Sequence, residues 1–185
     1  MSYQSITYRT SLSEQIIKEI EEEFALNVSI SQSTIKNQSL NNDNIIRKSK
    51  NGWISTNHWL SGFIWFYVQK ANSENFLYDI DGIENDVIQY CKYDVGDYYS
   101  WHTDYSISST SNSTRKISFI IQITNPLEYE GGEVQFIDEN DRLYHACKDV
   151  GSVILFDSRT KHRVKKIRRG VRKSIVGWVV GPRWR

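Results

Sequence analysis

Cysteine is scarce in this chain: Cys91 and Cys147 are the two cysteines among 185 residues. One possible pair does not make the disulfide framework of a small secreted protein. Neither residue belongs to a CxxC pair, so the spacing indicates no thiolate zinc site and no dithiol redox centre. This scarcity favours a reducing compartment, and we expect the protein to be cytoplasmic.

Long hydrophobic runs are also missing. A membrane-spanning helix needs about 20 consecutive apolar residues, and no run in this sequence approaches that length. The mean hydropathy is -0.53, and residues 1–10 are polar, without the apolar stretch of a signal peptide. The sequence therefore predicts neither a membrane segment nor an export signal.

An excess of charge of one sign is missing too, because the formal net charge is +1. The distribution is uneven, however, since residues 159–173 contain nine Lys and Arg and no acid. This stretch is either a solvated basic hairpin or a surface that attracts an acidic peptide or an RNA-containing assembly. Nothing in the sequence predicts the oligomeric state.

The length and composition predict one globular domain, 1–185, because hydrophobic residues make up 39% of the chain and can form a sizeable core. Within it, residues 1–75 are predicted to form a helical N-terminal support and residues 76–185 a β-rich part. Between the helices, the polar stretch 29–44 predicts a loop with at most one edge strand.

Two helices are predicted in the N-terminal part. Apolar residues at helical spacing predict the first over 12–24, where Ser11 and Glu14 have the spacing of a capping box. The second is predicted over 58–71, with Asn57 as its N-cap residue. We expect both helices to pack on one face of a sheet.

From residue 76 onward, short β-prone runs alternate with turn residues, and no long helical pattern lies between them. Such a pattern is typical of an antiparallel sandwich or jelly roll, so the predicted fold class is α+β. The predicted strands are 76–80, 87–93, 98–101, 116–123, 133–137, 152–156, 163–166 and 172–180.

One histidine and one aspartate lie two residues apart at the end of a predicted strand. Side chains two apart on a strand point to the same face, so His102 and Asp104 can reach one metal ion. His162, after the strand 152–156 and a turn, is the best candidate for a third ligand. Two imidazoles and one carboxylate suit iron(II) and leave coordination positions open, whereas a structural zinc site takes four protein ligands.

A candidate site for an organic acid accompanies this motif. Arg172 lies ten residues after His162 on the next predicted strand, and a guanidinium can bind a carboxylate through two hydrogen bonds. Tyr93 lies nine residues before His102, where its phenol can bind the same carboxylate. The order and spacing of these features together predict a metal site beside a carboxylate site.

The C-terminal two thirds of the chain resembles the 2-oxoglutarate and iron(II)-dependent oxygenases of the prolyl 4-hydroxylase group. A short N-terminal segment, Arg47-Lys-Ser49, is also similar to a strand of that group. The matching pieces are Tyr93 to Asp104, Arg115 to Ser118, Tyr129 to Glu133, His162 to Val164, and Arg172 to Trp178.

The resemblance implies a double-stranded β-helix (jelly-roll) core with His102, Asp104 and His162 as ligands of Fe(II). It also implies that Tyr93 and Arg172, helped by Ser174, bind the C5 carboxylate of 2-oxoglutarate. The implied reaction consumes O2 and couples decarboxylation of 2-oxoglutarate to hydroxylation of a C–H bond, with ascorbate as a supporting reductant.

Two residues refine this resemblance. Related halogenases lack the carboxylate ligand, so Asp104 favours hydroxylation. Nucleic-acid demethylases of this superfamily typically carry a second Arg where this chain has Trp178, which counts against that branch.

Three functions stay open at this stage. The first is hydroxylation of a peptide or protein at proline, as in the procollagen-proline 4-dioxygenases. The second is hydroxylation of a free amino acid or another small molecule, and the third is a non-catalytic β-sandwich that binds a metal or a partner. The Ser/Thr-rich segment 106–114, directly after the metal motif, is either a lid over the substrate or an idle loop.

Overall fold

A computed structural model describes residues 5–36, 45–106 and 112–184 of the chain. It contains the helices α1 (Glu14–Asn27) and α2 (Trp59–Ala71), a π-helical turn over Asn72–Phe76 and a 3-10 turn over Glu84–Asp86. Its strands are β1 (Ile6–Tyr8), β2 (Ser31–Lys36), β3 (Ile45–Ser55), β4 (Gly82–Ile83), β5 (Val87–Tyr93), β6 (Tyr98–His102), β7 (Ser113–Gln122), β8 (Val134–Ile137), β9 (Leu143–His145), β10 (Val153–Asp157), β11 (Lys161–Val164) and β12 (Arg172–Pro182).

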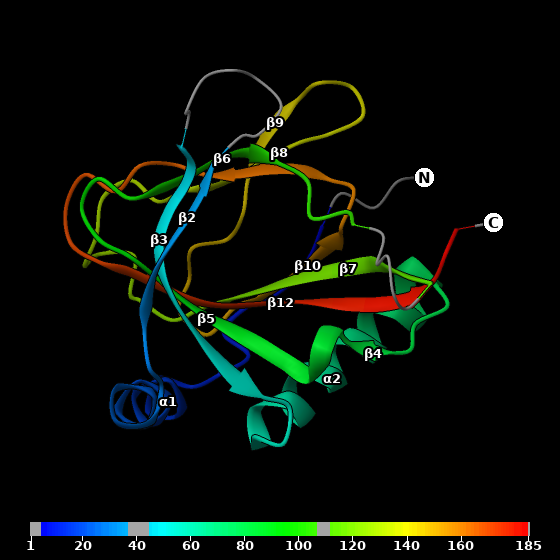
Figure 1. The fold of residues 1–185 in the computed structure, drawn as a ribbon, viewed down its shortest axis with the longest axis horizontal. Coiled ribbons are helices and arrows are strands. Elements are labelled where there is room, and N and C mark those ends of the chain that lie inside the picture. The colour runs from blue at the N-terminus through cyan, green and yellow to red at the C-terminus, as the bar shows by residue number, and fades with distance from the viewer. Residues whose placement is uncertain (1–4, 37–44, 107–111, 185) are drawn as a thin grey trace.

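The twelve strands found in the described residues form one curled antiparallel sheet, in the order β1-β10-β7-β12-β5-β3-β6-β11-β8-β9. Strand β2 pairs with β3, and β4 pairs with β12. The turning point of the sheet is β3, because residues 50–55 pair with β5 while Arg47 and Lys48 pair with β6. Figure 1 shows the result: β10, β7, β12 and β5 lie next to the helices, and β6, β8 and β9 lie on the opposite side.

Both helices start later than the sequence predicted. Ser13, not Ser11, caps α1 by accepting a hydrogen bond from the backbone N–H of Ile16 at 3.3 Å. The predicted capping box is wrong because the Leu12 N–H pairs with the carbonyl of Gly151, which holds this residue outside the helix. Ser11 therefore donates back to the carbonyl of Tyr8.

The N-cap of α2 is His58 and not the predicted Asn57. The Nδ1 atom of His58 accepts a hydrogen bond from the Leu60 N–H at 3.2 Å, which leaves its Nε2 to contact Glu23 of α1 at 2.8 Å. One side chain thus caps α2 and ties it to α1.

The N-terminal 75 residues contribute strands as well as helices. The edge strand expected within 29–44 is β2. Strand β3, which lies in the middle of the sheet, was indicated only at residues 47–49, by their similarity to a strand of the oxygenase group. Its buried positions carry the polar residues Arg47, Ser49 and Asn51, so no apolar alternation marks it. The predicted strand over 76–80 is also wrong, since a π-helical turn ends there at Leu77, which has a positive φ of 55°.

The sheet has two apolar cores because alternate side chains of each strand point to opposite faces. The first core lies between the helices and β5, β7, β10 and β12, and there Ile64 and Val68 of α2 are fully buried. The second core lies between the two layers of the sheet, around Phe136 and Phe156. The polar side chains described next open into this second space. In the described part of the chain, neither helix is long and apolar enough to cross a membrane.

Candidate active site

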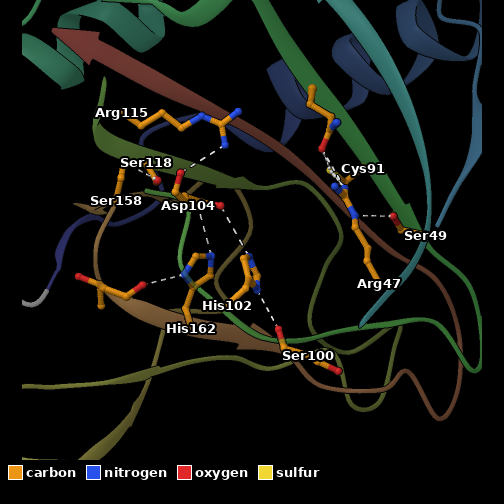
Figure 2. A network of polar contacts seen from close by, with 12 residues as sticks. Arg47, Ser49, Cys91, Ser100, His102, Asp104, Arg115, Ser118, Ser158 and His162 are labelled. Carbon is orange, nitrogen blue, oxygen red and sulfur yellow. Dashed lines mark hydrogen bonds and ion pairs between the residues drawn. The ribbon is translucent and has the colours of Figure 1, made fainter. Parts of the chain in front are cut away.

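Three potential metal ligands converge between the two layers of the sheet. His102 ends β6, Asp104 follows it, and His162 lies on β11 directly opposite His102 in the strand pairing. One ligand atom from each residue lies within 4.8 Å of the other two. Figure 2 shows the three side chains pointing toward one another. The structure therefore brings together the three residues that the sequence singled out.

The orientation of both imidazoles is fixed by the backbone. Nδ1 of His102 lies 2.8 Å from the carbonyl of Ser100, and Nδ1 of His162 lies 3.0 Å from the carbonyl of Thr160 (Figure 2). Because a carbonyl only accepts, Nδ1 carries a proton in each ring, and Nε2 is the atom that faces Asp104. The Nε2 atoms lie 3.6 and 3.5 Å from the carboxylate oxygens of Asp104.

The charge states of these groups suit a cation. Burial, together with the neighbouring His162, lowers the pKa of His102 to about 4, so its ring is neutral at pH 7. Burial by itself would raise the pKa of the Asp104 carboxyl, but the two histidines and hydrogen bonds from Ser118 and Trp178 outweigh burial and lower it. Neutral imidazoles and an ionised carboxylate are the forms that bind a metal.

Neighbouring side chains hold these groups in place. The Asp104 N–H donates to the carbonyl of Ser158 at 2.9 Å, and the Ser158 hydroxyl lies 3.0 Å from that of Ser118. Tyr99 stacks on the His102 ring with centroids 3.4 Å apart, and Phe156 meets the His162 ring edge-on. These contacts restrain the positions of the three potential ligands.

Arg172, the predicted carboxylate-binding residue, is buried on the inner face of β12. Its Nη1 donates to the Ser174 hydroxyl at 3.2 Å and its Nη2 to the Gln122 side chain at 2.9 Å. The Nε of Arg172 is buried with no hydrogen-bond partner. Tyr93 lies opposite Arg172 in the pairing of β5 and β12, with the guanidinium 5.7 Å from its ring. An incompletely satisfied buried guanidinium is suited to an anion.

Gly131 and Gly132 both have positive φ, 82° and 62°, the backbone conformation that favours glycine. Gly132 has a second role, since a Cβ there would lie 3.0 Å from Cδ of Arg172 and 2.5 Å from Ile167. The absence of a side chain lets the turn pack directly on the stem of Arg172.

A second buried guanidinium, Arg47, lies in the same cavity and was not predicted as a site residue. It donates to the Ser49 hydroxyl at 3.0 Å, to Asn51 at 3.0 Å and to Gln89 at 2.9 Å (Ser49 contact in Figure 2). The Sγ atom of Cys91 lies 3.6 Å from Nη2 of Arg47. Burial raises the pKa of the Cys91 thiol, and the charges of Arg47 and Arg172 oppose this shift. The sequence marked Arg47 only through the similarity of residues 47–49 to the oxygenase group, and this similarity assigned no role to its side chain.

The cavity contains more positive than negative charge. Of the described residues that line it, Asp104 is the one acid, against two guanidiniums, Arg47 and Arg172. Isolated buried charges are costly, so a cavity of this kind gains free energy when it binds an anion. A negatively charged ligand beside a metal ion would balance these charges.

An open groove of about 720 Å³ leads from the surface to Asp104 and is lined on one side by β2, β3 and β5. At its edge Arg115 stacks on Trp178, 3.9 Å from the ring centroid, and forms an ion pair with Glu84. Arg115 also donates to the backbone carbonyl of Asp104 at 3.4 Å (Figure 2). Of the segment 106–114, which the sequence left open as a lid or an idle loop, residues 107–111 lie outside the described residues.

Comparison with known proteins agrees with this geometry. Residues 88–180 match the model of a family described as the 2OG-Fe(II) oxygenase superfamily. A PKHD-type hydroxylase from Gloeothece citriformis is 33% identical over 90 residues, 49% of this chain and 40% of that protein. Another from a Synechococcus strain is 36% identical over 90 residues, 46% of this chain and 37% of that protein. The matched stretch thus spans less than half the length of these relatives.

Solved structures resemble nearly the whole chain. A Pseudomonas putida prolyl-4-hydroxylase has a TM-score of 0.68 at 14% identity and covers 98% of this chain and 94% of its own. The viral collagen prolyl hydroxylase of Paramecium bursaria Chlorella virus-1, in its 2OG complex, has a TM-score of 0.67 at 16% identity and covers 97% of both chains. A Trichoplax adhaerens prolyl hydroxylase has a TM-score of 0.70 at 17% identity, over 95% of this chain and 82% of that one.

At these identities the structural likeness establishes the fold. The predicted double-stranded β-helix core with helices on one sheet is confirmed. The family match covers half of the chain, from β5 to β12, and includes both histidines and the aspartate of the cluster. The chain therefore belongs to the 2OG-Fe(II) oxygenase superfamily.

Proposed function

We propose that this protein is an iron(II)- and 2-oxoglutarate-dependent hydroxylase that acts on a proline-containing peptide or protein. One observation carries the proposal: the Nε2 atoms of His102 and His162 and the carboxylate of Asp104 converge in a cavity that also contains the buried Arg172. A facial set of two imidazoles and one carboxylate is typical of non-haem iron oxygenases.

In this proposal His102, Asp104 and His162 hold the iron. Their fit rests on the fixed tautomers, the neutral ring of His102 and the ionised carboxyl of Asp104. Bound iron(II), with O2 and 2-oxoglutarate, supplies the oxidising power for C–H hydroxylation, and the co-substrate is decarboxylated to succinate. Asp104 keeps the carboxylate that a halogenase would lack, which favours hydroxylation.

We assign the far carboxylate of 2-oxoglutarate to Arg172. The free Nε of Arg172 and its neighbours Ser174 and Tyr93 offer hydrogen-bond donors to such a group. Gln122 holds the guanidinium from the other side and fixes its plane. Arg47 supplies a second positive charge, so a dianion in this cavity is better balanced than a neutral molecule.

The open groove supports a peptide substrate over a small molecule. A free amino acid calls for a closed cavity, whereas this groove is open and is lined by residues from Ser31 on β2 to Trp178 on β12. The names of several structural relatives, prolyl hydroxylases, favour proline as the reacting residue. Ascorbate as a supporting reductant and a cytoplasmic location, suggested by the two free thiols, complete the proposal.

The experiment is a succinate assay. Purified protein is incubated with iron(II), ascorbate and 2-oxoglutarate, with and without proline-containing peptides. The succinate formed is measured, and the masses of the peptides are determined by mass spectrometry. We expect peptide-stimulated succinate and a gain of one oxygen atom at proline. His162→Ala should lose both signals, and His145→Ala, on the outer face of β9, should keep them.

Other outcomes separate the alternatives. Stimulation by a free amino acid and by no peptide would contradict the substrate and keep the chemistry. Absence of turnover with every substrate, together with no iron binding, would contradict the oxygenase proposal and leave a non-catalytic β-sandwich.

A further inference from the structure

The outer face of β6 and β11 carries a cluster of cations that the proposed reaction does not use. His162 and Val164 of β11 point into the molecule, so Arg163 and Lys165 point outward, followed by the exposed Lys166. These residues belong to the basic stretch 159–173. The basic surface and the metal site thus occupy opposite faces of the same strand.

These cations line a surface hollow of about 320 Å³, which we call the basic hollow. Its lining contains no carboxylate among the described residues and includes Tyr98, Tyr99, Ser100, Arg163, Lys165 and Lys166. Lys165 lies 3.6 Å from Glu133, but that carboxylate is shared with Lys148 at 3.7 Å. No described acid lies within ion-pair distance of Arg163 or Lys166, so the hollow keeps a positive potential.

Two aromatic rings and an amide orient the cations. The guanidinium of Arg163 lies 4.5 Å from the ring centroid of Trp101 and donates to Gln135 at 2.7 Å. The ammonium of Lys166 lies 5.7 Å from the ring of Tyr98. These contacts limit side-chain motion and occupy one face of each ring.

The basic hollow and the substrate groove lie on opposite faces of β6 and share Tyr99, which also stacks on His102 in the metal site. Thr103, after the end of β6, lines the groove, and Tyr98, at the start of β6, lines the hollow. An extended peptide advances about 3.3 Å per residue, so a chain that leaves the groove at Thr103 and follows the outer face of β6 reaches the hollow in about five residues. A charged segment of the substrate can therefore be bound at a site separate from the reacting residue.

We propose that the basic hollow binds an acidic segment of the peptide substrate, a few residues from the residue that reacts. This inference rests on the proposed function for the groove. An acidic peptide fits better than single-stranded RNA, because base binding relies on free aromatic faces and the rings of Trp101 and Tyr98 are covered by cations. Carboxylates need only the cations and hydrogen-bond donors that the hollow presents.

The test is direct binding, measured by fluorescence anisotropy in low salt without iron or 2-oxoglutarate. The probes share an Ala-Ala-Pro-Ala-Ala core that is extended by four Glu or four Gln, on its N-terminal or its C-terminal side. An eight-nucleotide oligouridylate is the nucleic-acid probe. We expect a Glu extension on one side to lower Kd about tenfold relative to Gln, and the preference to shrink as salt screens the charges.

The test variant is Lys165→Glu/Lys166→Glu, and the matched control is Lys18→Glu/Lys70→Glu, which changes the net charge equally on the exposed surfaces of α1 and α2. The test variant should lose the preference for Glu and bind a peptide with four Lys more tightly, whereas the control should behave like wild type. A change of preference with unchanged thermal stability separates recognition from misfolding.

The remaining outcomes contradict this inference or separate it from the proposed function. Equal affinity for Glu and Gln extensions on both sides, or tighter binding of the oligouridylate, would overturn the acidic-peptide assignment. The protein could also prefer the Glu extensions although no peptide stimulates succinate formation. This result would overturn the proposed function and leave the hollow as an acidic-peptide site.

Discussion

Two adjacent rows of residues on the same three strands differ completely in chemistry. In one row Tyr90, Ile175 and Ile121 are paired across β5, β12 and β7 and face the helices. In the next row, one residue along each strand, Cys91, Ser174 and Gln122 are paired and face the cavity. The strands thus carry the stability of the fold on one face and the polar site on the other.

This comparison shows why the register of the sheet matters for function. Because side chains alternate with a period of two, a shift of one residue would exchange the two rows. The apolar row fixes the register through its burial against α1 and α2, and the polar row is positioned as a consequence. Substitutions on the two faces should therefore affect different properties.

The largest effect is expected at the metal cluster. Asp104→Ala removes the anionic donor between two imidazoles, so iron binding and turnover should both fall by three orders of magnitude or more, on the order of 4 kcal/mol. Calorimetric titration with Mn(II) measures binding, and circular dichroism checks the fold. Retention of metal affinity would show that the three residues do not form the site.

In the row of residues that faces the helices, we expect a substitution to cause a loss of comparable size in the free energy of unfolding. Ile121 is fully buried against the helices, and Ile121→Ala should lower the free energy of unfolding by about 2–5 kcal/mol. Urea denaturation measures this value. Metal affinity of the folded variant should stay within about twofold of wild type, since nothing on the cavity face changes. A loss of affinity comparable to that of Asp104→Ala would contradict the separation of the two faces.

A smaller and more specific effect is expected at Arg172. Arg172→Ala should raise the 2-oxoglutarate concentration needed for half-maximal turnover by about a hundredfold, about 2.7 kcal/mol, because it removes a charge-assisted bidentate contact. Iron affinity should not change. Turnover assays at varied 2-oxoglutarate measure the effect, and a dependence equal to that of wild type would show that another group, with Arg47 the first candidate, binds the far carboxylate.

The smallest effect is expected at the carboxyl group of Asp157, the last residue of β10. Burial would raise the pKa of Asp157, but hydrogen bonds from Arg159 and Tyr78 outweigh burial and lower it. A lowered pKa in the folded state stabilises the protein above the unfolded value near 4, and this stability is lost as pH falls through the folded value. Asp157→Asn should therefore cost about 1–2 kcal/mol at pH 7.

The pH dependence checks that assignment. The difference in unfolding free energy between wild type and Asp157→Asn should narrow as pH falls below about 4, where the unfolded carboxyl is protonated. Urea denaturation at pH 7, 5 and 3 measures it. If this difference were independent of pH, the stability lost in Asp157→Asn would come from packing and not from the charge of the carboxylate.

The sequence by itself determined the β-rich part of the fold and singled out the three residues that converge between the sheet layers. Short β-prone runs between turn residues located β5, β7, β10 and β12 within a few residues, because most side chains of these strands are buried. The metal motif was visible because His102 and Asp104 lie two apart on a strand, a local relation. Residues 76–80 were mispredicted as a strand because short apolar runs fit a strand or a helical turn equally well.

Only the tertiary structure decided which distant residues meet. The pairing of β6 with β11 places His162 opposite His102, and the pairing of β12 with β7 places Gln122 on Arg172. Strand β3 was indicated only by the similarity of residues 47–49 to the oxygenase group, and the role of Arg47 was missed, because a buried polar side chain looks like a solvent-exposed one in the sequence. Hydrogen bonds between remote strands, and the burial that gives polar residues their chemistry, are long-range properties that local periodicity does not contain.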